Sequence, residues 1–135
     1  MEVSNEHTLL VMQIESEKGL SNVSGVAQVE GMDVLYVGPA DLSASVGLPL
    51  GVVDGVLLSA CRKVAEAARQ SGKAAAIDLS EIDNLQLLLS AGFTMFTYGS
   101  DMGFLQSACR DGVESFRRRC GLASSSMQCL RADLL

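Results

Sequence analysis

The stretch GPADLS at residues 38–43, which follows QIE at residues 13–15 by one predicted strand-and-helix unit, decides the fold. Each motif stands at the end of a short apolar run that predicts a parallel strand. In α/β proteins the residues that carry chemistry collect at the carboxyl ends of such strands. The carboxylates of Glu15 and Asp41 are therefore predicted to belong to one site.

Around these motifs, short apolar runs alternate with helix-period segments four times, which indicates repeated βα units on a parallel sheet. The predicted strands cover residues 9–15, 34–37, 74–79 and 94–98. The helical segments that follow end at glycine, the usual residue just past a helix. Four such units are half of a (β/α)8 barrel, which typically needs about 250 residues. We therefore predict that residues 1–121 form the C-terminal half of a TIM barrel and that 122–135 are a mobile tail.

Composition excludes several classes of function. The chain has 135 residues, of which 48% are hydrophobic and 19% charged, enough for one packed domain. A net charge of −6 opposes binding to nucleic acid or anionic lipid. No run approaches the roughly 18 apolar residues of a membrane span. Four cysteines without a C-x-x-C pair suggest reduced thiols in an intracellular protein. We expect a cytoplasmic location by default, or an organellar one if the natural protein is longer.

Strand alternation places Gln13 and Glu15 on one face of the first strand and Met12 and Ile14 on the other. If the second face packs on helices, the first looks into the barrel at its carboxyl-terminal mouth. Neighbouring strands lie about 4.8 Å apart, so Glu15 and Asp41 can share one divalent cation. Mg²⁺ or Mn²⁺ suits two carboxylates better than zinc does. The alternative for either residue alone is a helix N-cap or a solvated turn.

Other polar residues near strand ends have simpler explanations. Ser100-Asp101 fits a helix N-cap followed by an acid in the first turn. Ser43 and Ser45 could each cap a turn, so neither is given a catalytic role. His7 precedes the first strand, at the wrong end for catalysis, and is expected to be exposed. Arg117–Arg119 is expected to be the solvated last turn of a helix, where cations complement the helix dipole.

The motifs VMQIES and GMDVLYVGPADLSASVGLP, both within residues 10–50, resemble those of the metal-dependent pyruvate aldolases of the HpcH/HpaI family. The resemblance continues through SGKAAAI at residues 71–77 and AGFTMFTYGSDMGFL at 91–105. The family includes 4-hydroxy-2-oxoheptanedioate and 2-dehydro-3-deoxyglucarate aldolases. It implies a TIM barrel of the phosphoenolpyruvate/pyruvate-binding type.

The resemblance also implies roles for individual residues. Glu15 and Asp41 would hold a divalent metal, Mg²⁺, Mn²⁺ or Co²⁺. Gln13 would lie beside the bound pyruvate, and the backbone N–H groups of Gly38 and Ala40 would hold its carboxylate. The metal would act as a Lewis acid that stabilises an enolate. The implied reaction is reversible cleavage of a 4-hydroxy-2-oxo acid to pyruvate and an aldehyde, without a Schiff-base lysine.

The chain departs from the family in one respect. The family's catalytic histidine and carboxylate-binding arginine come from the first half of the barrel, and no residue here takes their positions. We therefore expect this chain to be a truncated form of low activity that joins a complementary half-barrel or forms a homo-oligomer. Two alternatives stay open: a non-catalytic remnant or interaction fragment of the fold, and an acyl-CoA lyase like the citrate lyase β-subunit.

Overall fold

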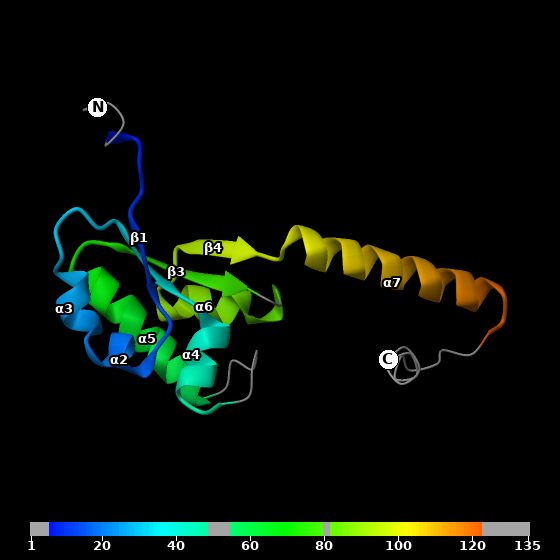
Figure 1. The fold of residues 1–135 in the computed structure, drawn as a ribbon, viewed down its shortest axis with the longest axis horizontal. Coiled ribbons are helices and arrows are strands. Elements are labelled where there is room, and N and C mark those ends of the chain that lie inside the picture. The colour runs from blue at the N-terminus through cyan, green and yellow to red at the C-terminus, as the bar shows by residue number, and fades with distance from the viewer. Residues whose placement is uncertain (1–5, 49–54, 80–81, 123–135) are drawn as a thin grey trace, which may run out of the picture. The chain divides into compact units, whose positions relative to one another are not determined.

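Four parallel strands form one sheet in the order β1-β2-β3-β4 (Figure 1). In this computed structural model, which describes residues 6–48, 55–79 and 82–122, the strands are Val11–Ile14, Val34–Val37, Ala74–Leu79 and Met95–Tyr98. The four predicted parallel strands are thus confirmed, with shorter first and last strands. β1 is an edge strand, so it can pair only where β2 runs beside it, and its ladder pairs Val11 with Val34 through Ile14 with Val37.

Helices follow every strand, and Figure 1 shows those of the first unit gathered on one face of the sheet. The chain divides into two compact units, Met1–Tyr98 and Gly99–Leu135, and each is described by itself. The first unit contains α2 (Glu17–Ser21), α3 (Val23–Ala27), α4 (Pro39–Ser45), α5 (Gly55–Gln70), the 3-10 turn η1 (Ile82–Asn84) and α6 (Leu85–Ala91). The helices predicted after the third and second strands are present at α6 and α5.

The hydrophobic core lies between these helices and one face of the sheet. Strand alternation turns Leu35 and Val37 of β2 and Ile77 of β3 toward the helices, and all three are fully buried. Helix α5 meets them with its apolar stripe, in which Leu57, Cys61, Val64 and Ala68 are buried. These four residues repeat at helical spacing along the sequence, so the same pattern that predicts the helix also defines its buried face.

The opposite face of the sheet carries the alternate residues, and no described helix of the first unit covers it (Figure 1). β1 and β4 form the two edges of the sheet. At the β1 edge, Leu10, Val11 and Met12 are 50%, 40% and 42% exposed. These apolar side chains at an open edge are available for pairing with another segment or chain.

The second unit contains α7 (Asp101–Arg119). Ser100 caps this helix, since its Oγ accepts a hydrogen bond of 3.1 Å from the N–H of Gly103, and Asp101 lies in the first turn. The expected cap is therefore confirmed, as is the placement of Arg117–Arg119 in the last turn. Residues 123–135 of the predicted tail lie outside the described residues. No helix in the described ranges is long and apolar enough to cross a membrane.

Two adjacent leucines of α6 provide a matched test of this packing. Leu88 is 1% exposed and Leu89 is 44% exposed. Leu88→Ala should lower the free energy of unfolding by about 2–5 kcal/mol, because it removes buried methyl groups and leaves a cavity. Leu89→Ala should lower it by less than about 1 kcal/mol. Urea unfolding followed by circular dichroism measures both, and equal losses would contradict the described face of α6.

The buried thiol on α5 gives the fold a dependence on alkaline pH. Burial raises the pKa of Cys61 to about 11, so the folded protein keeps the neutral thiol. The unfolded thiol ionises near pH 9, which favours the unfolded chain. Stability is full below about pH 9 and falls as the pH rises toward 11, by on the order of 1 to 2 kcal/mol at pH 10.5. Urea unfolding at pH 8 and 10.5 should show a larger loss for the wild type than for Cys61→Ala; parallel losses would contradict it.

Candidate active site

Gln13 and Glu15 lie at the carboxyl end of β1, the first in the strand and the second directly after it. Ile14 points into the core at 2% exposure, so Gln13 lies on the face that the helices do not cover. Helix α2 begins immediately afterwards and is capped by Ser16, whose Oγ accepts from the N–H of Gly19 at 3.1 Å. Because Ser16 provides the cap, the exposed carboxylate of Glu15 is not needed to start the helix.

The GPADLS motif begins directly after the last residue of β2, Val37. Gly38 is the N-cap of α4 and Pro39 occupies the first turn, where its missing N–H costs nothing. Asp41 lies in the same turn and is exposed, whereas Leu42 is fully buried and anchors the helix. Ser43 is also buried, and its hydroxyl donates to the carbonyl of Pro39 at 2.6 Å. The buried residues Leu42 and Ser43 thus hold the turn in place, while the carboxylate of Asp41 is exposed.

Close packing at Gly38 brings the two motifs together. A Cβ placed on Gly38 would lie 2.5 Å from Nε2 of Gln13 and 3.4 Å from Cβ of Glu15. Glycine at position 38 therefore leaves the space that the amide of Gln13 occupies. The N–H of Gly38 donates to the carbonyl of Ile14 at 3.3 Å, which extends the β1–β2 ladder into the turn. The N–H of Ala40, in the first turn of α4, has no acceptor within its own helix.

A hydroxyl from the far end of α4 joins the two loops. The N–H of Glu17, which begins α2, donates to Oγ of Ser45 at 2.9 Å. Ser45 thereby connects the segment just after Glu15 to the helix that carries Asp41. Sequence reasoning considered Ser45 only as the cap of a nearby turn, because its partner is 28 residues away and no local motif marks the contact.

The carboxylates of Glu15 and Asp41 have the oxygen donors that a hard divalent cation prefers, but they are only two of the roughly six or more ligands that it needs. Glu15 and Asp41 both offer carboxylate oxygens from the ends of neighbouring parallel strands. Within the part of the chain that the structure describes, no three His, Cys, Asp or Glu residues gather closely enough to hold a metal. The pair can therefore supply two oxygen ligands, and the rest would come from water, substrate or another segment.

Two basic residues, His7 and Lys73, lie away from this site. His7 is exposed and precedes β1, as expected. Lys73 precedes β3, and its Nζ donates to the carbonyls of Met32 at 2.6 Å and Val29 at 3.0 Å. These carbonyls belong to the segment that enters β2, at the opposite end of the strand from GPADLS. Lys73 therefore supports the base of the sheet.

Sequence reasoning missed a polar cluster on the uncovered face. The hydroxyls of Tyr36 and Thr97 lie 2.6 Å apart, and Thr97 Oγ1 donates to Oδ1 of Asp78 at 2.7 Å. The three residues come from β2, β4 and β3. The available signal was a polar residue at an alternate position of an otherwise apolar strand, as in AAAIDL at residues 74–79.

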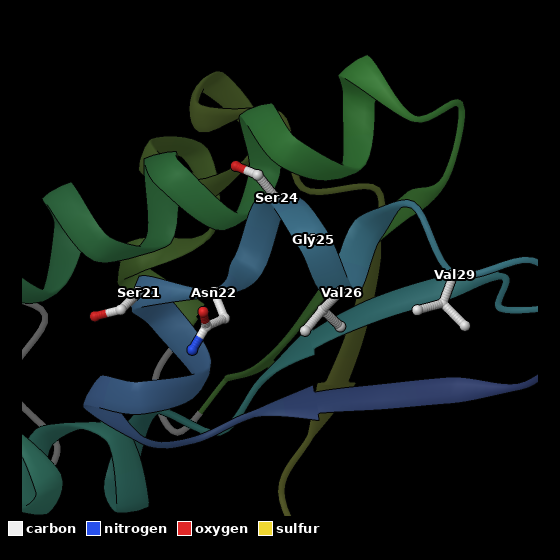
Figure 2. Close-up of a pocket in the computed structure, with 6 residues that line it drawn as sticks. All are labelled: Ser21, Asn22, Ser24, Gly25, Val26 and Val29. Carbon is white, nitrogen blue, oxygen red and sulfur yellow. The ribbon is translucent and has the colours of Figure 1, made fainter.

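A surface hollow on α2 and α3 does not coincide with these groups (Figure 2). Figure 2 shows its lining residues, which carry small polar or apolar side chains and none that ionises: Ser21, Asn22, Ser24, Gly25, Val26 and Val29. Chemistry that needs an acid, a base or a metal ligand is therefore better placed at the strand ends than in this hollow.

Known proteins show which family this chain resembles. The model of the HpcH/HpaI aldolase/citrate lyase family matches residues 1–108. Curated relatives include the 5-keto-4-deoxy-D-glucarate aldolases of Enterobacter sp. (strain 638), at 31% identity, and Klebsiella pneumoniae, at 30%. Each alignment covers 85% of this chain and 45% of the relative. The chain thus spans about half the length of the relatives that it matches.

Solved structures of related proteins also match this chain over about half of their length. Citrate synthase SbnG superposes with a TM-score of 0.81 at 27% identity, over 90% of this chain and 49% of that one. An HpcH/HpaI aldolase/citrate lyase family protein from Burkholderia cenocepacia J2315 superposes with a TM-score of 0.77 at 31% identity, over 86% and 45%. The four βα units correspond to half of the TIM barrel of these neighbours, as predicted. The chain belongs to the HpcH/HpaI aldolase/citrate lyase family.

Proposed function

We propose that this chain carries the metal-binding and 2-oxo-acid-binding half of a carbon–carbon lyase that cleaves 4-hydroxy-2-oxo acids to pyruvate and an aldehyde. The observation that carries the proposal is the packing of Gln13 and Glu15 against Gly38, one turn before Asp41. The aldolases among the curated relatives support the reaction class. The chain spans about half the length of those relatives. That a complete enzyme containing this half would cleave such substrates is therefore also proposed.

In this proposal Glu15 and Asp41 hold a divalent cation, with Mg²⁺ or Mn²⁺ favoured by two carboxylate ligands. When bound, the cation supplies Lewis-acid stabilisation of the enolate. The amide of Gln13 orients the 2-oxo acid, and the N–H of Ala40 is a donor for its carboxylate. The N–H of Gly38 already donates to Ile14 at 3.3 Å, so it would have to share its proton with the substrate.

The uncovered sheet face and the open edges suggest that this chain works together with a partner. The single histidine of the sequence, His7, precedes β1 rather than following a strand. A complementary half-barrel, or another copy in a homo-oligomer, would cover the exposed apolar residues at the β1 edge. We infer that the isolated chain turns substrate over weakly and that pairing supplies the missing acid, base and carboxylate-binding groups.

A metal titration tests the carboxylate pair. Calorimetry with Mn²⁺ should detect binding to the wild type, and Glu15→Gln or Asp41→Asn should weaken it at least about tenfold, since each removes one charged ligand. Glu17→Gln is the matched control, because Glu17 is also exposed and lies two residues from Glu15. Equal affinity for the wild type and a Glu15→Gln/Asp41→Asn double variant, with circular dichroism unchanged, would refute the metal assignment.

A glycine substitution tests the substrate side separately. Gly38 has φ −91° and ψ 92°, which alanine also adopts, so Gly38→Ala should fold. Its new methyl group would displace the amide of Gln13, only 2.5 Å away. We expect weaker pyruvate binding to the Mn²⁺-loaded chain, with Mn²⁺ affinity retained.

Gly25→Ala is the control for this substitution, because a Cβ at position 25 would meet nothing within 4 Å apart from its chain neighbours and the backbone of its own helix. Pyruvate titrations by calorimetry compare the two variants. If Gly38→Ala binds pyruvate as tightly as Gly25→Ala does, Gln13 has no part in holding the 2-oxo acid.

A further inference from the structure

One face of α7 carries a line of exposed apolar side chains. None of the residues of this helix is buried, and Met102, Leu105, Val113 and Phe116 are between 54% and 66% exposed. Successive residues of an α-helix are about 100° apart, so these four and the exposed Cys109 fall within an arc of about 80°. We call these five residues the α7 stripe. A continuous exposed apolar surface of this kind marks an interaction site.

The α7 stripe is symmetric about its middle residue, Cys109. Met102 and Phe116 each lie seven residues from it, and Leu105 and Val113 each lie four residues from it. A two-fold axis through Cys109, perpendicular to the helix, would therefore set Met102 opposite Phe116 of a second copy and Leu105 opposite Val113. Each apolar side chain then meets another apolar side chain.

Charges at the two ends of α7 favour this antiparallel arrangement. Asp101 and Arg119 are both exposed, and the 18 residues between them make five full turns. They therefore lie on the same side of the α7 stripe, at opposite ends of the helix. In the antiparallel pair, Asp101 of each copy lies beside Arg119 of the other, with an offset of about 3 Å along the axis. A parallel pair would place like charges together, which is unfavourable.

Small residues on that same side allow the two helices to approach closely. Ala108 and Gly112 flank Cys109 and are exposed. Packed helices lie about 8–10 Å apart, and their Cα atoms lie about 2.3 Å from each axis. The facing Cα atoms of two Cys109 residues would then be about 4–5 Å apart. A disulfide spans about 4.4–6.8 Å between Cα atoms, so the two thiols would be within linking distance.

We propose that a second copy of this chain covers the α7 stripe, with the two α7 helices antiparallel and the two Cys109 residues at the two-fold axis. Such a contact uses the same surface of both copies, so it closes on itself at the dimer. This interface is separate from the β1 edge and from the carboxylate pair. It does not depend on the proposed function.

Sedimentation equilibrium of the full chain from about 1 to 100 µM should show monomers in equilibrium with dimers. Leu105→Asp and Val113→Asp should each weaken the dimer at least about tenfold, because the new carboxylate would be buried against apolar side chains. Ser107→Asp is the matched control, since it adds the same charge about 160° around the helix from Cys109. Circular dichroism should show that all three variants are folded, because no residue of α7 is buried.

Cysteine crosslinking tests the orientation of the two helices. A Cys120→Ser/Cys129→Ser variant keeps Cys109 and the buried Cys61. Diamide accepts the two electrons and two protons that a pair of thiols releases, and it should link this variant into a covalent dimer on a non-reducing gel. The matched Cys109→Ser/Cys129→Ser variant keeps Cys120 instead. In the antiparallel pair its two Cys120 residues would lie about 33 Å apart and should stay unlinked.

Three results would overturn the proposal. The first is a wild-type chain that stays monomeric over the whole concentration range. The second is a dimer that is as tight in Leu105→Asp as in Ser107→Asp, since another surface, such as the β1 edge, would then hold it. The third is crosslinking through Cys120 as fast as through Cys109, which an antiparallel pair cannot give.

Discussion

The parallel pairing of β1 with β2 is the constraint on which the candidate site depends. Ile14 pairs with Val37, and the ladder continues into the turn through the N–H of Gly38 and the carbonyl of Ile14. This register sets Gln13 and Glu15 beside a residue that has no side chain to obstruct them. A slip of one residue would turn Gln13 toward the helices and Ile14 toward solvent. The burial of Ile14 therefore fixes the position of the polar residues on either side of it.

The sheet has two faces with different tasks. One is closed by α5 and its neighbours and holds the core, including Leu35, Ile77 and Cys61. The other carries small and polar residues, Ala76 and Asp78 among them, and no described helix of the first unit covers it. In a closed barrel the second face would line the interior. The open strands and exposed apolar residues at the β1 edge are what half of such a barrel leaves unpaired.

Local chemistry predicts much of this architecture, and its errors have physical causes. The caps at Ser100 and the stop at Gly92 depend on residues within one turn, so the sequence identifies them directly. The predicted first strand was too long because apolar residues such as Leu9 satisfy strand periodicity whether or not a neighbour is present. Only β2, with four residues, decides how far β1 can pair. The sequence predicts one half-barrel domain over residues 1–121. In the structure, contacts divide the chain into two units, and α7 belongs to the second, Gly99–Leu135.

By itself, the sequence determined the four βα units and the placement of Glu15 and Asp41 at the ends of neighbouring strands. It could do so because hydrophobic alternation and the turn residues that end a strand act over a few positions. Only the tertiary structure decided that Ser45 binds the backbone of Glu17 and that Tyr36, Thr97 and Asp78 form one chain. These contacts join residues 19 to 61 positions apart, and strand register and helix packing, which no local pattern encodes, bring their atoms within hydrogen-bonding distance.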